Sequence, residues 1–155
     1  MLDIRPIRSD EDVELARRLF REYESDIGVD LCFQGFAQEL AGLPGDYVPA
    51  RGCLLIARWA GEPVGCVAMR PHGDDICEMK RLYVRPGQRG RHVGRALVEA
   101  IIAEAGRVGY RRMRLDTLPS MATAIAMYRR LGFVEIDPYT SNPVAGALFM
   151  ELTID

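Results

Sequence analysis

Residues 85–101 read RPGQRGRHVGRALVEAI, and the interpretation of the chain starts from this stretch. Its first half contains proline and glycine, which favour a loop, and its second half has apolar residues at helical spacing. Its arginines are Arg85, Arg89, Arg91 and Arg95, and no acidic residue occurs before Glu99. The first amides of a helix lack intrahelical partners and carry partial positive charge. The stretch therefore predicts a loop that opens into a helix and holds an anion.

The glycines of this loop, Gly87, Gly90 and Gly94, allow the backbone to turn sharply and to approach a ligand closely. Such a nest suits a pyrophosphate best. The phosphate-binding pattern G-x-x-x-x-G-K-S/T and the dinucleotide pattern G-x-G-x-x-G are both absent. From these residues alone, a solvated arginine-rich loop that caps a surface helix is an equal alternative.

The whole chain has the composition of an ordinary globular protein. Its 155 residues suit one domain spanning 1–155, and 48% hydrophobic residues are enough for a core. The formal net charge is -2. This charge argues against nucleic acid and anionic membrane as partners, because neither is attracted to an acidic protein. The basic loop is therefore expected to serve a small anionic ligand.

The cysteines and the N-terminus point to a cytoplasmic protein. The sequence MLDIRPIRSDEDVE (1–14) lacks the apolar region of a secretory signal, and no run is long enough for a membrane span. The cysteines are Cys32, Cys53, Cys66 and Cys77. They show neither a C-x-x-C pair nor zinc spacing, and His72 and His92 are the only histidines, so we expect reduced thiols and no metal.

Local patterns predict a β-α-α-β-β-β-α-β-α-β-β order. Ser9 begins the first helix with an S-x-x-D cap, and Gly28 ends it. Strands are expected over 2–7, 53–59, 64–70, 76–84, 111–117, 133–136 and 147–152, and helices over 9–28, 33–40, 93–108 and 119–131. A hairpin-rich first half followed by β-α-β-α crossovers predicts an α/β (α+β) fold with a mixed sheet and helices on both faces.

Two segments resemble the GNAT superfamily of acyl-CoA-dependent N-acyltransferases. MKRLYVRPGQRGRHVGRALVEA (79–100) resembles its acyl-CoA motif, whose centre reads Q/R-x-x-G-x-G/A, and AIAMYRRLGFVEI (124–136) resembles its A-x-x-x-Y-x-x-x-G-F segment. His92 departs from the motif, because the family has glycine there. This puts close backbone approach in doubt if the position needs a positive φ. The resemblance implies a mostly antiparallel sheet of about seven strands.

The resemblance implies that acetyl-CoA is the co-substrate and that no metal takes part. Backbone amides from Arg89 to Arg95 would hold the pyrophosphate, and the strand edge at 82–84 would pair with the pantetheine arm. The Val84 N–H would then polarise the thioester carbonyl. The implied cofactor-binding residues are Leu82, Tyr83, Val84, Arg89, Gly90, Arg91, His92, Val93, Gly94, Arg95, Met121, Ala124 and Tyr128. Met121 replaces an asparagine that is frequent in the family, so packing is expected to replace a hydrogen bond.

The catalytic candidates are Tyr128 and Glu78. The resemblance implies that Tyr128 protonates the departing thiolate; the alternative is a buried tyrosine that packs beside its helix neighbours. Glu78 is the acidic residue nearest to the motif that could accept the proton of an ammonium group, directly or through water. The alternative for Glu78 is an ion pair with Lys80 or with an arginine.

The sequence says less about the binding site of the acceptor substrate. In the family, segments equivalent to 26–36 and 137–146 line it. The candidates are Tyr23, Phe33, Gln34, Tyr139 and Asn142. Aromatic core packing and turn formation are equal alternatives for these residues.

The function expected from these residues is N-acetyl transfer to the amine of a small molecule, by direct attack and without a covalent acyl-enzyme. A non-catalytic CoA-sensing domain and an RNA-binding module that uses the same basic loop are the alternatives. A homodimer is expected by analogy with the family alone.

Overall fold

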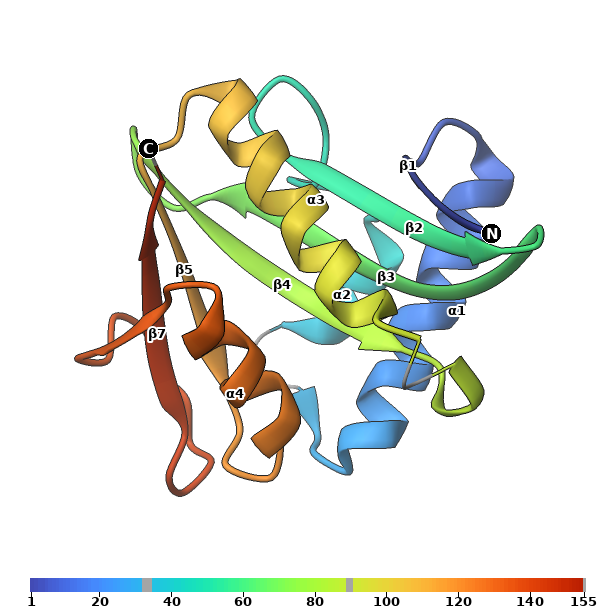
Figure 1. Cartoon of the computed structure of the whole chain (residues 1–155). Coiled ribbons are helices and arrows are strands. Elements are labelled where there is room, and N and C mark those ends of the chain that lie inside the picture. The colour runs from blue at the N-terminus through green and yellow to red at the C-terminus, as the bar shows by residue number, and fades with distance from the viewer. Residues whose placement is uncertain (32–34, 89–90, 155) are drawn as a thin grey trace.

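The computed structural model describes residues 1–31, 35–88 and 91–154. Figure 1 shows a twisted sheet of seven strands in the order β1-β2-β3-β4-β5-β7-β6. The strands are β1 (Leu2–Pro6), β2 (Cys53–Trp59), β3 (Glu62–Pro71), β4 (Ile76–Val84), β5 (Arg112–Thr117), β6 (Val134–Ile136) and β7 (Leu148–Thr153). The helices are α1 (Asp10–Ile27), α2 (Phe36–Ala41), α3 (Val93–Val108) and α4 (Ala122–Arg130), with a short 3-10 helix over Pro86–Gln88.

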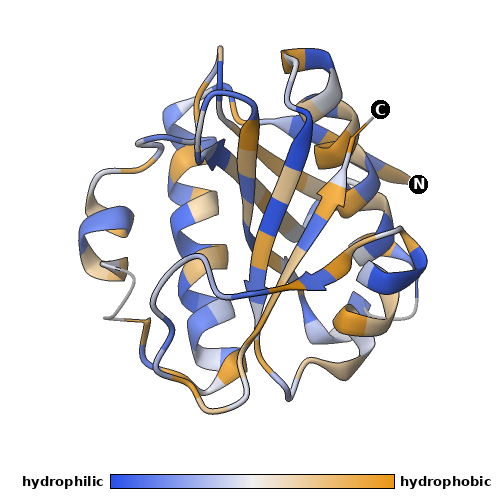
Figure 2. Ribbon diagram, turned by 90° about the vertical axis from the view of Figure 1, so that its left-hand side faces the viewer, coloured by the Kyte–Doolittle hydropathy of each residue, from blue (hydrophilic) through white to orange (hydrophobic). Residues whose placement is uncertain are grey.

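The predicted fold class is confirmed. β4 and β5 pair in parallel, and the other neighbouring strands pair antiparallel. The sheet is thus mixed and mostly antiparallel, with helices on both sides, as Figure 2 shows from the side. The order of elements is the predicted one, because α3 and α4 supply the crossovers that connect β4 to β5 and β5 to the last strands.

Each face of the sheet has its own core. On one face, Leu97 and Ile101 of α3 pack with Met69, Met113 and Leu115 of the strands. On the other face, Leu19 and Phe20 of α1 and Phe36 of α2 pack over strand residues that include Leu54 and Ile56. The strands therefore show alternating bands of hydropathy in Figure 2.

α1 begins and ends where its sequence predicts. The Ser9 hydroxyl accepts a hydrogen bond from the Asp12 amide at 3.1 Å, and Gly28 ends the helix with a φ of 67°. The acidic first turn opposes the partial positive charge of the helix N-terminus. The C-terminal end of α1 consequently lies at a fixed place beside β4, where Tyr23 reaches the middle of the sheet.

β4 contains an irregularity that shapes the site. Its register with β3 shifts between Cys66 and Ala68, which face Tyr83 and Lys80. Within this bulge Arg81 adopts a φ of 61°, a left-handed conformation that non-glycine residues seldom adopt. The bulge turns the end of β4 away from the line of its first half, and Figure 1 shows β4 and β5 diverging.

Two helix starts differ from the prediction. α4 begins at Ala122 rather than at 119, because the Met121 amide bonds to the Leu118 carbonyl at 2.9 Å and closes a turn there. α2 begins at Phe36 rather than at 33, and the residues from 32 to 34 lie outside the described part of the chain.

Candidate active site

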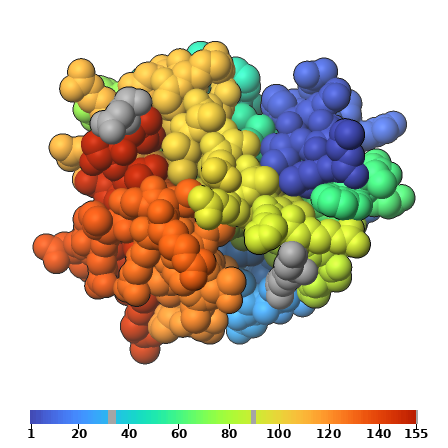
Figure 3. Space-filling view, in the orientation of Figure 1, coloured from blue at the N-terminus to red at the C-terminus, as the bar shows by residue number. Residues whose placement is uncertain are grey.

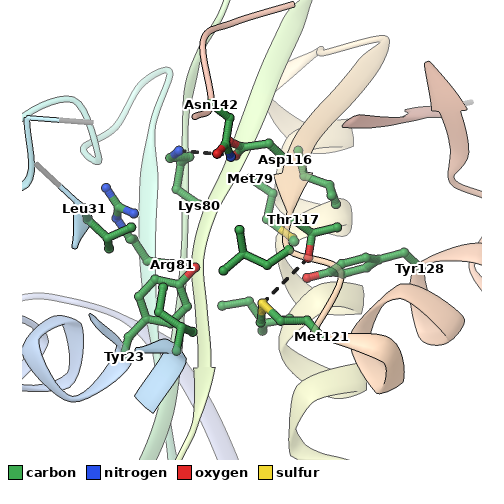
Figure 4. Close-up of a pocket in the computed structure, with 14 residues that line it drawn as sticks. Tyr23, Leu31, Met79, Lys80, Arg81, Asp116, Thr117, Met121, Tyr128 and Asn142 are labelled. Carbon is green, nitrogen blue, oxygen red and sulfur yellow. Dashed lines mark hydrogen bonds and ion pairs between the residues drawn. The ribbon is translucent and has the colours of Figure 1, made fainter. Parts of the chain in front are cut away.

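A pocket lies where β4 and β5 diverge. Their paired register ends at Glu78 opposite Arg114, and beyond this point both strands line a narrow pocket that is partly open to solvent. The lining residues are Tyr23, Ile27, Leu31, Met79, Lys80, Arg81, Leu82, Leu115, Asp116, Thr117, Leu118, Met121, Tyr128 and Asn142. Figure 4 shows Lys80, Asp116 and Asn142 at one end of it and Met121 and Tyr128 at the other.

The apolar end of the pocket is built by α4. Tyr128 is 3% exposed, and in Figure 4 its hydroxyl points into the pocket. Burial raises the pKa of Tyr128, so its hydroxyl keeps its proton at neutral pH. The back of its ring lies against Phe133, with ring centroids 5.5 Å apart. Tyr128 therefore combines a buried ring, packed against Phe133, with a hydroxyl that faces the pocket.

Met121 lies at the N-terminus of α4 and lines the same end of the pocket. The Thr117 hydroxyl lies 3.7 Å from its sulfur and donates to it. Ala124, one turn along, is half-buried and packs against the α3-side core rather than lining the pocket. The packing that replaces an asparagine contact is thus consistent with the position of Met121.

The predicted residues 82–84 divide between the two faces of β4. Leu82 lines the pocket. The Tyr83 ring packs under α1, and its hydroxyl donates to Glu22 at 3.1 Å. A methyl group added to Gly94 would lie 3.6 Å from a methyl of Val84, so the first turn of α3 sits directly against the end of β4.

The N-terminus of α3 has the geometry expected of an anion-binding turn. His92 is exposed and adopts a φ of 59°, so the position that carries glycine in the family does require a positive φ. Ala96 makes the first helical hydrogen bond, to the His92 carbonyl, so the amides of Val93, Gly94 and Arg95 come before the regular helical bonds. These amides could hold a phosphate.

The arginines of the opening stretch have different partners. Arg85 is bound to Glu22 through two hydrogen bonds of 2.9 and 2.8 Å. The Arg91 guanidinium stacks over the Trp59 ring, 4.8 Å from its centre, and Arg95 forms an exposed ion pair with Glu99 at 3.5 Å. Arg91 and Arg95 are exposed beside the α3 N-terminus, whereas Arg89 and Gly90 lie outside the described residues.

Glu78 is buried in a network of charges. Arg70 donates to one carboxylate oxygen at 2.9 Å, and the Tyr139 hydroxyl donates to the other at 2.7 Å. Lys80 lies 4.0 Å from that second oxygen. Burial alone would raise the pKa of Glu78, but Lys80, Tyr139 and Arg70 together outweigh it and hold the pKa below its usual value. The ion pairs considered as the alternative for Glu78 are present.

The network extends across the sheet as a row. Arg70 of β3 faces Glu78 of β4, Glu78 faces Arg114 of β5, and Arg114 faces Glu151 of β7. Arg114 donates to Glu151 at 2.8 Å. This half of the sheet face is charged, while the half under α1 and α2 is apolar.

The predicted acceptor residues only partly come together. Tyr23 and Asn142 line the pocket from opposite sides. Tyr139 does not line it and instead binds Glu78. Phe33 and Gln34 lie outside the described residues. The segment 137–146 thus contributes to the pocket and to the charged network at once.

Sequence reasoning missed Lys80, Arg81 and Asp116. All three line the pocket, and each has a buried side chain. The signal was present: Glu78 and Lys80 are charged residues two positions apart in a mostly apolar strand, which places them on one face. Arg81 forms hydrogen bonds of 2.9 and 2.7 Å with Glu39 and stacks over Phe36, so it ties α2 to the bulge.

Comparison with known proteins identifies this arrangement. Residues 13–133 match the model of the acetyltransferase (GNAT) family. The chain belongs to the GNAT family. A relative from Schizosaccharomyces pombe, described as an uncharacterised N-acetyltransferase, is 39% identical over 153 residues, which cover 97% of this chain and 94% of the relative. The chain is accordingly an N-acetyltransferase of this family.

Solved GNAT structures share the fold. PaiA N-acetyltransferase from Thermoplasma acidophilum in complex with coenzyme A has a TM-score of 0.77 and 20% identity, with 99% of each chain covered. YncA from Salmonella typhimurium, with its cofactor acetyl-CoA, has a TM-score of 0.70 and 20% identity, covering 99% of this chain and 94% of YncA.

Metal ligands and membrane-spanning helices are both missing from the described chain. Over 1–31, 35–88 and 91–154, no group of three or more His, Cys, Asp and Glu side chains is arranged to hold a metal ion. Within the same ranges, no helix has the length and apolar character needed to cross a bilayer.

Proposed function

We propose that this GNAT enzyme transfers an acetyl group from acetyl-CoA to the amine of a small molecule, by direct attack of the amine on the thioester. One observation carries this proposal. The pocket between β4 and β5 joins the Tyr128 hydroxyl at its apolar end to a buried charged group, Lys80 and Asp116, at its polar end. A thioester at the first end and an amine at the second would meet between the strands.

Acetyl-CoA fits the residues around the pocket. The first amides of α3, with Arg91 and Arg95 nearby, supply the donors and the positive charge that a pyrophosphate needs. Figure 3 shows this end of α3 (yellow) and the residues just before it (yellow-green) on the same face of the molecule as α4 (orange). We place the pantetheine arm along Leu82, Tyr83 and Val84, with Met121 and Ala124 on the opposite side.

The proposed reaction needs an acid and a base. The amine nitrogen forms a bond to the acetyl carbon, the carbon–sulfur bond breaks, and the sulfur takes a proton. Tyr128 is suited to supply that proton, since burial keeps its hydroxyl protonated. Glu78 is ionised, as a base must be, but it does not line the pocket. We therefore assign Glu78 an indirect role, with the proton passing through an intermediary.

The cysteines of the described chain do not suit a covalent mechanism. Cys53, Cys66 and Cys77 are all buried. Burial raises the pKa of Cys77 to about 12, so its thiolate is scarce at neutral pH. Cys77 also lies in the core on the α3 side of the sheet, away from the lining of the pocket. Direct attack is the simpler route.

Thermal shift and thiol release together test the proposed function. Acetyl-CoA at about 100 times its Kd should stabilise the native state by about 2.7 kcal/mol, and dephospho-CoA should stabilise it less if arginines bind the 3′-phosphate. A panel of small amines should then release CoA thiol in proportion to acetylated product. A melting temperature that does not respond to acetyl-CoA would refute the proposal. A response without thiol release from any amine would favour the CoA-sensing alternative.

A further inference from the structure

Lys80 and Asp116 form an oppositely charged pair inside the pocket. They extend from neighbouring strands at positions that continue the register of Glu78 and Arg114. The Lys80 nitrogen lies 3.6 Å from a carboxylate oxygen of Asp116, and the side chains are 6% and 7% exposed. Both line the pocket, so a ligand in it meets a cation and an anion side by side.

Asp116 is held in place from behind. The Asn142 side-chain nitrogen donates to the second oxygen of Asp116 at 3.0 Å. The Asn142 side-chain oxygen accepts a hydrogen bond from the Val144 backbone amide at 3.0 Å. The segment after β6 therefore fixes the carboxylate with one oxygen directed toward Lys80. A carboxylate oriented in this way is a preorganised site for an ammonium group.

The Lys80–Asp116 pair is looser than the arginine ion pairs around it. Arg70–Glu78, Arg81–Glu39 and Arg114–Glu151 are separated by 2.7 to 2.9 Å. At 3.6 Å, the Lys80–Asp116 pair is longer than a charge-assisted hydrogen bond. Lys80 also lies 4.0 Å from Glu78, so its charge lies between two carboxylates and is held less tightly by each than the arginines are by theirs.

The arrangement discriminates between classes of amine. A buried charge is costly unless an opposite charge compensates it. A simple cationic amine at Asp116 would lie close to the positive charge of Lys80. Because Glu78 and Asp116 already balance Lys80, a simple cation would add net positive charge to this group, whereas an amine that carries a neighbouring carboxylate adds none; its ammonium can lie on Asp116 and its carboxylate beside Lys80.

We propose that the acceptor is a free amino acid, with its ammonium group on Asp116 and its carboxylate on Lys80. This inference rests on the proposed function and names its substrate class. The ammonium group loses one proton before the nitrogen attacks and a second as the amide bond forms; the thioester carbon–sulfur bond breaks and the sulfur takes up one of these protons, so the products are an N-acetyl amino acid, CoA and one released proton. Acetylation removes the positive charge that Asp116 recognises, which favours release of the product.

The test compares each amino acid with its decarboxylated counterpart. Calorimetry on the enzyme–CoA complex measures binding of both, for pairs such as tyrosine and tyramine or histidine and histamine, and thiol release measures turnover. We expect at least one amino acid to bind and react about 10-fold to 100-fold better than its amine, since hydrogen bonds to a charged partner contribute on this scale.

Variants then assign the preference to the pair. Lys80→Met should reduce the preference for the carboxylate about 10-fold or more, because the amino acid should bind more weakly and the decarboxylated amine more tightly. Asp116→Asn should weaken the binding of both the amino acid and its amine. Lys80→Arg, which keeps the charge, is the second variant at this position. Asp12→Asn, in an ion pair with Arg58 near the N-terminus of α1, is the matched control and should change neither ligand.

The outcomes separate the two proposals. Amino acid binding with the expected preference but without thiol release would refute the proposed function and support the acceptor site. Turnover of decarboxylated amines that equals or exceeds turnover of amino acids would overturn the acceptor site and leave N-acetylation intact. If Lys80→Met weakened the binding of the amino acid and of its amine equally, the acceptor site would also be overturned. Neither binding nor turnover of any amino acid would refute the acceptor site.

Discussion

Tyr128 is the residue on which the proposed chemistry depends most directly. Its hydroxyl faces the pocket, and burial raises its pKa and keeps it protonated. Tyr128→Phe should lower kcat by about 10²-fold, the lower end of what a positioned acid contributes. The stabilisation by acetyl-CoA should stay the same, because the ring and its packing remain. Steady-state kinetics and thermal shift measure the two effects.

The matched control for this substitution is Tyr110→Phe. Tyr110 is equally buried, but its hydroxyl donates to the Arg51 carbonyl outside the pocket. Tyr110→Phe should lower the melting temperature while kcat and acetyl-CoA binding stay unchanged. If Tyr110→Phe and Tyr128→Phe lower kcat alike, the acid role of Tyr128 is wrong.

His92 tests the departure from the family pattern. A left-handed conformation costs a residue with a side chain about 1 kcal/mol or more, and costs glycine almost nothing. His92→Gly should therefore keep or raise the melting temperature and keep acetyl-CoA affinity. His92→Val should lower stability by about 1–2 kcal/mol, because β-branched residues tolerate a φ of 59° least. Urea denaturation would measure both changes; a more stable valine variant would contradict this account.

At the scale of single residues, sequence reasoning reached the backbone-determined features better than the charged ones. The motif position raised the question of a positive φ at His92, and the structure answers it with a φ of 59°. The pairing of Lys80 with Asp116 did not follow, since it depends on the register between β4 and β5. No local pattern encodes register between strands that a whole helix separates.

Among the elements, α1 depends on its cap. The Ser9 hydroxyl binds the Asp12 amide, and Ser9→Ala should lower stability by about 1 kcal/mol. The melting temperature should fall by about 2–4 °C for a chain of this size. Ser120→Ala, on an exposed turn, is the control and should stay within about 0.5 kcal/mol. Equal effects of the two substitutions would mean that the cap contributes nothing.

The elements themselves were predictable where local signals agree. Strand 76–84 and helix 93–108 have the predicted bounds, because apolar periodicity, glycine and proline all change at their ends. β3 runs from Glu62 to Pro71, longer at both ends than predicted. Prolines near its ends favour turns, but pairing with β2 and β4 extends the strand to them.

For the whole molecule, the charged row from Arg70 to Glu151 joins strands from both halves of the chain. Glu78 has a lowered pKa in the folded state, so its contribution to stability is complete above its unfolded pKa near 4.5. That contribution is lost as the pH falls through the folded value. Glu78→Gln should therefore be less stable than the parent by about 3 kcal/mol at pH 7, and the difference should shrink below pH 4.5.

Urea denaturation at several pH values measures this difference. Glu99→Gln, in the exposed pair with Arg95, is the control and should change stability by less than about 1 kcal/mol throughout. A gap between parent and Glu78→Gln that stays constant down to about pH 3 would show that the carboxylate charge does not hold the row together.

The stacking of Arg91 on Trp59 has a practical consequence. Trp59 is the chain's one tryptophan, so all indole emission comes from a ring whose face carries a guanidinium from the anion-binding turn. A phosphate that draws Arg91 away removes a cation from that face and alters the emission. If the α3 N-terminus binds the cofactor as proposed, a natural fluorophore lies at the entrance to that site, and cofactor binding should be measurable in real time without a label.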